Sequence, residues 1–455
     1  MVPNLSDSLG RDMIEHRSAI APQGLPRRIT TSAATLAALA SWALAPVPAQ
    51  AAKLEAAFVV LGSQGAIARA VIADATTCPE ITIDGRQQPM NVRASPNATF
   101  PVLVCELPIP PGTQSAAVES SPLPLPNAEL KSIVAFGDTG CRLKAAQGSR
   151  GGTGKGDVDD EDRGKFQDCN IPSAWPFAHV AAGIAAAKPD LVIHVGDYLY
   201  RETACPPRDR GCARSPYGDD WPTWKADFFA PAAPALRAAP WIVVRGNHEI
   251  CRRTGVGYFR LIDPTPANGA PPCIDLIPHY TVTVGEQSFI VLDTSDAADA
   301  CPCDTARFAA EFSGMRAKPG TWLVTHRPVW GFRPHRKTIN ATLQQALAGS
   351  GGKLPDGISL AVAGHIHVAE VLSFADKRAP QFVLGTGGTL LAGKIQGNLT
   401  GEKIGGTTVS YGRADHRFGF AMFEPVAGGW TATFRDDRSR TLFGCKVGAG
   451  EVACN

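Results

Sequence analysis

Alternating apolar and polar residues mark the first part of the chain that has a regular pattern. The alternation runs through residues 54–120, as in Ala68-Arg69-Ala70-Val71-Ile72 and Pro101-Val102-Leu103-Val104-Cys105, with turn residues between the runs. A period of two is typical of strands with one buried face. The pattern predicts a small β-domain of sandwich type over residues 52–120. The proline-rich segment 121–130 is predicted to be a semi-rigid linker.

From residue 131 onward, short apolar runs alternate with helical patterns. The predicted strands are Ile133–Phe136, Leu191–Val195, Trp241–Val244, Phe289–Leu292, Trp322–Thr325, Ile358–Ala363, Gln381–Leu384, Arg417–Phe423 and Trp430–Phe434. The predicted helices are Trp175–Ala187, Asp304–Phe312 with Asp304 as its N-cap, and Thr338–Leu347. Such alternation is typical of an α/β fold. It predicts an α/β domain over residues 131–437, followed by a cysteine-containing tail over residues 438–455.

An export signal is predicted over residues 1–51. Arg27-Arg28 precedes an Ala-rich apolar run from about Ala33 to Ala45, and Ala49-Gln50-Ala51 is a small-residue cleavage pattern. The run is too short to span a bilayer, so we expect no membrane span in the mature chain. The paired arginines favour the twin-arginine route, although Ile29-Thr30-Thr31 matches it poorly. An ordinary secretory signal is the alternative, and both place the protein in the periplasm or outside the cell.

The cysteines agree with export. All 12 lie after the proposed cleavage site, and their number is even. One hypothesis is sequential pairing, which joins Cys78 to Cys105, Cys141 to Cys169, Cys205 to Cys212, Cys251 to Cys273 and Cys445 to Cys454. Cys301 and Cys303 are then left over, because a bridge across one residue is strained. Zinc-binding cysteines are the weaker alternative, since the sequence has no pair of Cys-x-x-Cys knuckles.

Charge excludes some classes of partner. The 44 basic and 42 acidic residues give a formal net charge of +2. This balance gives no electrostatic reason to expect nucleic acid or an anionic membrane as a partner. It does not specify an oligomeric state.

Seven side chains suited to metal binding follow the ends of predicted strands. They are Asp138, Asp197, Tyr200, Asn247, His326, His365 and His367. Loops after the carboxyl ends of strands are where α/β sheets place their sites. A carboxylate can bridge two metals about 3.5–4 Å apart, and histidines with an amide oxygen suit borderline divalent metals. The series therefore predicts a two-metal site.

Tyr200 bears on which metal is bound. A phenol has a pKa of about 10 and is neutral at pH 7. Its ligation requires deprotonation, which a strongly Lewis-acidic ion drives. A phenolate favours Fe(III) over zinc. Taken alone, Tyr200 would more readily be a packed aromatic near a strand end, but its place three residues after Asp197, within this series, favours ligation.

Residues 131–437 resemble the calcineurin-like metallophosphoesterases and, within them, the purple acid phosphatases. The resemblance rests on Gly137-Asp138-Thr139-Gly140, Gly196-Asp197-Tyr198-Leu199-Tyr200, Gly246-Asn247-His248-Glu249, Leu323-Val324-Thr325-His326, Gly364-His365-Ile366-His367, His335 and Phe382–Gly388. It implies a metallophosphoesterase αββα sandwich. It also implies a ferric site of Asp138, Tyr200 and His367, a bridging Asp197, and a divalent site for Fe, Zn or Mn of Asn247, His326 and His365.

The resemblance further implies hydrolysis of small phosphate monoesters by a hydroxide held by the metal pair. His248 and His335 would lie over the phosphate, and one of them would protonate the leaving alkoxide. Glu249 is expected either to orient His248 or to be a surface carboxylate. Arg142 is a candidate phosphate contact, with a solvent-exposed side chain as the alternative.

Two other functions stay open. One is a phosphodiesterase that acts on nucleotides or lipid headgroups with the same metal site. The other is a catalytically inactive envelope-binding protein, which would be expected to have lost a ligand, whereas none is missing. Residues 148–164 and the cysteine-bearing loop 202–217 follow ligand blocks and are expected to border the site, so the resemblance does not identify the substrate.

Overall fold

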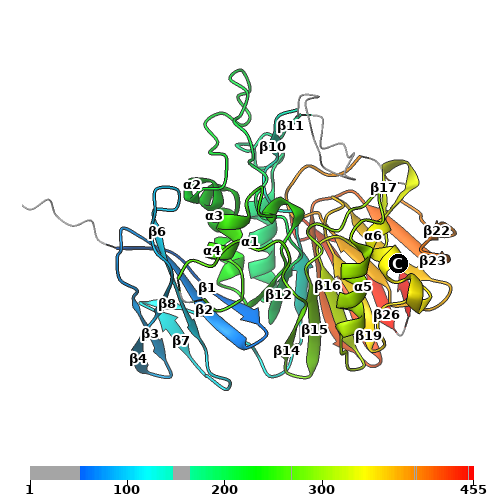
Figure 1. The fold of residues 1–455 in the computed structure, drawn as a ribbon, viewed down its shortest axis with the longest axis horizontal. Helices are drawn as coiled ribbons and strands as arrows, with labels where there is room; N and C mark the ends of the chain where they lie inside the picture. Colours follow the sequence, from blue (N-terminus) through cyan, green and yellow to red (C-terminus); the bar gives the residue numbers. More distant parts are fainter. Residues whose placement is uncertain (1–51, 147–163, 268, 394, 396, 449) are drawn as a thin grey trace, which may run out of the picture. The chain divides into compact units, whose positions relative to one another are not determined.

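Two mixed β-sheets pack face to face, and helices cover the outer face of each (Figure 1). The computed structural model describes residues 52–146, 164–267, 269–393, 395, 397–448 and 450–455. The predicted export signal and nearly all of segment 148–164 lie outside these residues. None of the described helices is long and apolar enough to cross a membrane.

The first sheet has eleven strands in the order β27-β26-β25-β24-β9-β12-β13-β1-β2-β6-β5. Its centre is parallel and consists of β9 (Ile133–Phe136), β12 (Leu191–His194) and β13 (Trp241–Val243). One flank is antiparallel and consists of β24 (Gly419–Val426), β25 (Gly429–Asp436), β26 (Thr441–Gly448) and β27 (Glu451–Cys454). The segment 438–455 thus adds two strands to this sheet.

The second sheet has eight strands in the order β14-β15-β16-β19-β21-β20-β23-β22. Four of them are parallel neighbours, namely β15 (Gln287–Leu292), β16 (Thr321–Thr325), β19 (Ile358–Ala363) and β21 (Gln381–Leu384). The others are β14 (Tyr280–Val284), β20 (Ala369–Phe374), β22 (Lys403–Ile404) and β23 (Thr407–Asp415). Apolar side chains of both sheets, such as Ile193 and Val324, share one core between the layers.

The three predicted helices are present, with two corrections at their starts, and the structure adds helical segments between residues 221 and 261 that were not predicted. The first sheet is covered by α1 (Phe177–Ala187), α2 (Trp221–Trp224), the π-helical segment η2 (Lys225–Phe229), α3 (Ala230–Leu236) and α4 (Gly255–Leu261). The second is covered by α5 (Thr305–Gly314) and α6 (Ala341–Ala346). Asp304 precedes α5, but its side chain makes no cap hydrogen bond. The start of α6 is later than predicted, because residues 337–339 pair as β18 with β17 (Gly331–Arg333) and Asn340 caps the helix instead.

The N-terminal strands form two sheets, one of which is shared with the rest of the chain. β1 (Lys53–Gly62), β2 (Gly65–Ala73), β5 (Asn91–Ala94) and β6 (Val102–Pro108) continue the first sheet, because β1 pairs in parallel with β13. β3 (Glu80–Ile83), β4 (Arg86–Pro89), β7 (Ala116–Val118) and β8 (Ser121–Pro122) form a separate small sheet.

The structure joins the cysteines in the predicted sequential pairs. All five predicted disulfides are present, and Cys301, expected to be left over, is bonded to Cys303. No free cysteine remains among the 12, all of which lie in the described residues.

A buried ion cluster ties the N-terminal strands to the segment after α4. Arg93 contacts Glu106 Oε2 at 2.8 Å and Asp263 Oδ2 at 2.9 Å. Arg69 contacts the same Glu106 oxygen at 2.9 Å and donates to the Leu261 carbonyl. Both guanidinium groups are fully buried. Removing one member would therefore leave an uncompensated charge in the interior.

We expect Arg93→Ala to lower the free energy of unfolding by about 3–5 kcal/mol, because Glu106 and Asp263 would lose a buried partner. Urea denaturation followed by circular dichroism measures the change. Lys53→Ala removes one of the two exposed lysines that pair with Glu55 and is the control, with an expected change below about 1 kcal/mol. Equal effects of the two variants would show that the cluster does not hold the N-terminal strands.

Candidate metal centre

All seven predicted ligands converge where the strands of both sheets end. Asp138, Asp197 and Asn247 follow β9, β12 and β13 of the first sheet, while His326 and His365 follow β16 and β19 of the second. Three of the seven, Asp138, Asp197 and His365, have left-handed backbones with φ of 58°, 59° and 71°. Such residues persist where the surrounding structure determines them, and they concentrate at functional sites.

One group of ligand atoms surrounds the Tyr200 hydroxyl. The hydroxyl oxygen lies 2.7 Å from Asp197 Oδ2, 2.9 Å from Asp138 Oδ1 and 2.9 Å from His367 Nε2. His367 Nδ1 donates to the Leu390 carbonyl at 2.7 Å, so Nε2 presents its lone pair. A phenol has one proton and can donate to only one of these three acceptors. In the other two contacts the hydroxyl oxygen therefore faces an acceptor with no proton between them.

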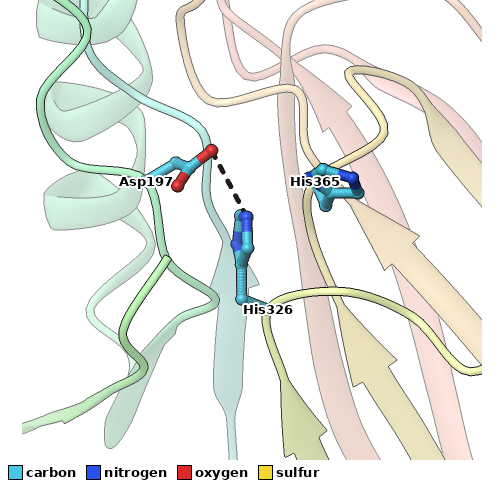
Figure 2. A group of neighbouring side chains, drawn as sticks. All are labelled: Asp197, His326 and His365. Atoms are coloured by element: carbon cyan, nitrogen blue, oxygen red, sulfur yellow. Dashed lines mark ion pairs between the residues drawn. The ribbon is translucent and has the colours of Figure 1, made fainter. Parts of the chain in front are cut away.

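The second group brings Asp197 together with His326 and His365 (Figure 2). His326 Nδ1 donates to the Val195 carbonyl at 2.8 Å, which turns Nε2 inward, 3.3 Å from Asp197 Oδ2 and 2.9 Å from Asn247 Oδ1. His365 Nδ1 lies 2.8 Å from the same amide oxygen, and its Nε2 faces Asp299 Oδ2 at 2.7 Å. The protein thus fixes the far side of each imidazole and turns the near nitrogen inward.

Both groups fit a metal ion. The ligand atoms of Asp138, Asp197 and His367 lie within 4.8 Å of one another, and so do those of Asp197, His326 and His365. Buried acceptors that face one another with too few protons to pair them all are the donor set a cation requires. Asp197 belongs to both groups, as a bridging carboxylate would. His365 and His367, two residues apart, enter different groups.

The electrostatics of the site favour positive charge. Burial and the neighbouring Asp138 and Asp197 charges raise the pKa of Tyr200 well above its usual value, so the phenol keeps its proton unless a cation displaces it. Burial lowers the pKa of His326, but the Asp197 charge outweighs it and raises that pKa to about 9. The same negative field that holds this proton would hold a metal, with which the proton competes.

Glu249 has neither of its two expected roles. It is fully buried, so it is not a surface carboxylate, and its oxygens accept main-chain N–H groups rather than contacting the His248 ring. Oε1 accepts from Tyr198 and Leu199 at 2.9 and 3.2 Å, and Oε2 accepts from Asp197 and Gly246, both at 3.1 Å. Burial and the Asp197 charge raise its pKa to about 7. Glu249 therefore holds the loop that carries Asp197.

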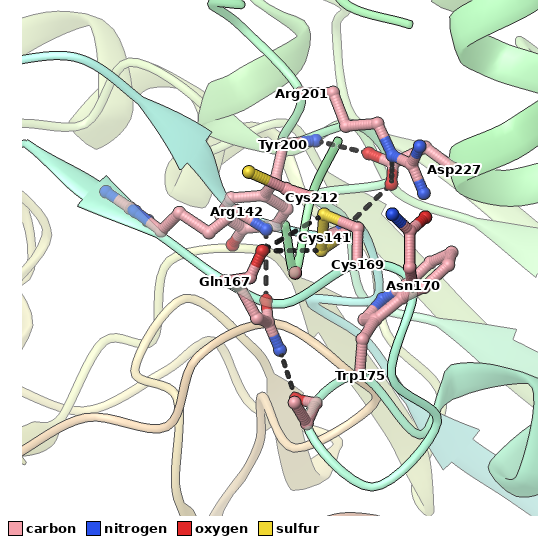
Figure 3. Close-up of a disulfide and its surroundings, with 12 residues drawn as sticks. Cys141, Arg142, Gln167, Cys169, Asn170, Trp175, Tyr200, Arg201, Cys212 and Asp227 are labelled. Atoms are coloured by element: carbon pink, nitrogen blue, oxygen red, sulfur yellow. Dashed lines mark hydrogen bonds and ion pairs between the residues drawn. A yellow bond between two sulfur atoms is a disulfide. The ribbon is translucent and has the colours of Figure 1, made fainter. Parts of the chain in front are cut away.

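Asp227, which the sequence analysis missed, holds another part of the centre (Figure 3). It is buried in η2 and accepts from the main-chain N–H groups of Cys141 and Tyr200 and from Arg201 Nε, each at 2.8 Å. It thereby joins the Asp138 loop, which the Cys141–Cys169 disulfide also restrains, to Tyr200. The sequence does contain a signal for this role, because Asp227 is a lone carboxylate within an aromatic, apolar segment.

His248 lies against Tyr200, with 3.8 Å between the ring centroids. Its Nδ1 is 2.7 Å from Glu202 Oε1, and Glu202 also forms an ion pair with Arg253. Glu202 begins the cysteine-bearing loop 202–217, so this loop reaches the centre through His248. Glu202, not Glu249, is the carboxylate beside the imidazole.

The two remaining predicted residues differ in their surroundings. Arg142 is buried, contrary to the solvent-exposed alternative, and its guanidinium carbon lies 5.4 Å from the centroid of the Tyr200 ring. His335 is exposed between β17 and β18, with a left-handed φ of 65°. Among the described residues, no hydrogen bond or ion pair joins His335 to a predicted ligand. Arg333, two residues earlier, does reach His365.

A family model described as calcineurin-like phosphoesterase matches residues 132–369. The chain therefore belongs to the calcineurin-like phosphoesterase family and is a metal-dependent phosphoesterase. Its family and the two groups of ligand atoms described above together imply a dinuclear metal centre.

Solved structures show the same fold. The purple acid phosphatase PPD1 from yellow lupin (Lupinus luteus) seeds superposes with a TM-score of 0.51 and 14% identity, over 85% of this chain and 72% of that chain. PhoD superposes with a TM-score of 0.53 and 11% identity, over 88% of this chain and 91% of that chain. No curated protein matches the chain. The predicted α/β metallophosphoesterase fold is confirmed.

We expect Glu249→Gln to destabilise the Asp197 loop, because an amide NH₂ would face main-chain N–H groups that now meet an oxygen. Leaving such groups without an acceptor costs about 1–3 kcal/mol in unfolding free energy. Urea denaturation of the metal-free protein measures this cost, and metal content after dialysis should fall as well. Glu286→Gln, at an exposed turn, is the control. A Glu249→Gln protein with unchanged stability and metal content would contradict the role in holding the loop.

Proposed function

We propose that the chain is an exported phosphatase that hydrolyses small phosphate monoesters with a mixed dinuclear centre. Fe(III) would take Asp138, Tyr200 and His367, and Fe(II), Zn(II) or Mn(II) would take Asn247, His326 and His365, with Asp197 between them. One observation carries the proposal. The Tyr200 hydroxyl lies within 2.9 Å of Asp138, Asp197 and His367, in a group that shares Asp197 with the histidines of the second sheet.

When bound, the two metals supply Lewis acidity and lower the pKa of a coordinated water toward neutrality. The histidine ligands are oriented through the ring nitrogens that face away from the metals. These nitrogens donate hydrogen bonds to the Val195 and Leu390 carbonyls and to the Asp299 carboxylate. The buried carboxylate of Glu249 keeps the Asp197 loop in place.

His248 is the proposed proton donor to the leaving alkoxide. Its Nε2 lies 3.9 Å from Asp197 Oδ2, so the ring borders both halves of the centre. Its Nδ1 lies 2.7 Å from Glu202 Oε1, and Arg253 Nη2 lies 3.0 Å from the ring nitrogens, so charged side chains hold the ring in place. In its protonated form this imidazole would donate to the alkoxide. His335 is proposed as a second donor and Arg142 as a phosphate contact. His335 lies in the hairpin turn next to Arg333, and Arg142 lies over the Tyr200 ring.

Export is supported by covalent structure. Six disulfides in one chain are typical of an oxidising compartment. We propose periplasmic or secreted localisation by means of the predicted signal over residues 1–51, with the twin-arginine route as the first hypothesis. Detection of the mature protein beginning near Ala52 in the periplasmic or secreted fraction would test this.

We expect the purified protein to be purple, because a phenolate bound to Fe(III) absorbs visible light by charge transfer, and we expect Tyr200→Phe to be colourless. Tyr198→Phe is the matched control, since the Tyr198 hydroxyl is buried without a hydrogen-bond partner among the described residues. Visible spectra with metal analysis measure both. A colourless native protein that contains only zinc would refute the ferric assignment and leave the phosphoesterase standing.

We expect a higher kcat/KM for 4-nitrophenyl phosphate than for bis(4-nitrophenyl) phosphate, because the proposed substrate is a monoester. Asp197→Ala should lose both metals and fall to background turnover, because Asp197 belongs to both ligand groups. Asp356→Ala, at an exposed position, should keep wild-type metal content and rate. Preference for the diester would favour a phosphodiesterase, and turnover by Asp197→Ala would refute the bridge.

A further inference from the structure

A cluster of positive charge lies beside the divalent half of the centre. One oxygen, Asp299 Oδ2, faces Arg327 Nη1 at 2.9 Å, His365 Nε2 at 2.7 Å and the Arg333 guanidinium. Arg333 Nη2 is also 2.8 Å from His365 Nε2. Two guanidinium groups thus lie against the side of His365 that faces away from Asn247.

The position of this cluster is fixed on several sides. Asn340 Nδ2 donates to the second oxygen of Asp299 at 2.7 Å, and Asn340 is also the cap of α6. The Arg327 main-chain N–H donates to Thr294 Oγ1 at 2.8 Å, and its Nε donates to the Ser295 carbonyl at 3.3 Å. Asp299 is thus the acceptor that both arginines share, and Asn340 ties it to the start of α6.

Exposure within the cluster is graded. The side chains of Asp299 and Arg327 are 2% and 4% exposed, whereas that of Arg333 is 19% exposed. An anion that approaches His365 from solvent would therefore meet Arg333 first. A guanidinium presents a planar fork of N–H donors that matches the oxygens of a phosphoryl group.

We propose that Arg333, held by Asp299 and backed by Arg327, binds the phosphoryl group of the substrate and selects phosphomonoesters over diesters. This inference rests on the proposed function and deepens it. A monoester phosphoryl group carries a second negative charge and a further unesterified oxygen, whereas a diester lacks both. The Arg333 guanidinium adds positive charge and hydrogen-bond donors, which stabilise the bound monoester more than the bound diester. Arg333 is thus a specificity-determining residue.

The test measures inorganic phosphate binding to the metal-loaded protein by isothermal titration calorimetry, together with steady-state kinetics on the two nitrophenyl substrates. We expect Arg333→Ala to raise the phosphate Kd and the monoester KM by about 10- to 100-fold, the range for a lost charge-assisted hydrogen bond. The diester KM should stay within about twofold, so the preference for the monoester should fall. Arg333→Lys keeps the positive charge but lacks the planar fork of donors. Its phosphate Kd and monoester KM should lie between those of the wild type and of Arg333→Ala.

Metal content separates this role from a structural one. Arg333→Ala should keep both metals, and Arg440→Ala, which removes an exposed arginine from its ion pair with Asp436, should match wild type throughout. Unchanged phosphate binding in Arg333→Ala, or loss of a metal from that variant, would overturn the proposal. Wild-type protein that binds phosphate in an Arg333-dependent manner but cleaves neither ester would overturn the proposed function alone.

Discussion

The concentration of buried negative charge around Asp197 is the constraint on which the rest of the centre depends. Asp197 accepts from the His248 main chain and the Tyr200 hydroxyl, and its carboxylate lies between two groups of inward-facing acceptors. Such groups are costly to bury unless a cation balances them. In the metal-free state protons supply part of this balance, which is why the pKa of His326 is raised to about 9 and Tyr200 stays neutral. The centre is therefore built to prefer cations before any substrate arrives.

The fold meets this constraint with rigid supports rather than with more charge at the centre. Parallel strands of two sheets end at the same edge, so five loops meet there without long connections. Glu249 and Asp227 accept main-chain N–H groups from the ligand loops, and two carbonyls fix the imidazoles. Gly364 packs so closely that a Cβ there would lie 2.4 Å from Asp138 Oδ2. These contacts make the left-handed backbones of Asp138 and Asp197 tolerable.

Sequence reasoning reached the ligands because each follows a short apolar run, and strand ends are legible from such patterns. The residues that hold the ligand loops could not be predicted in this way. Asp227 and Asp299 lie far in sequence from the loops they hold, and neither belongs to a motif. Glu249 was noticed but given the wrong partner, since the main-chain N–H groups it accepts cannot be inferred from side-chain types. The shared N-terminal sheet depends on the pairing of β1 with β13, which no local pattern records. The late start of α6 has the same origin, because β18 forms only by pairing with β17.

Arginines border both halves of the centre, and their exposure makes the two halves unequal. On the Tyr200 side, Arg142 lies over the phenol ring and is only 4% exposed. On the His365 side, Arg333 is partly open to solvent, while Asp299 and Arg327 behind it are buried. A dianion drawn toward the centre from solvent would therefore meet Arg333 before Arg142. Because His248, the proposed proton donor, lies against Tyr200 at the other end, a phosphoryl group held by Arg333 would direct its leaving group toward His248.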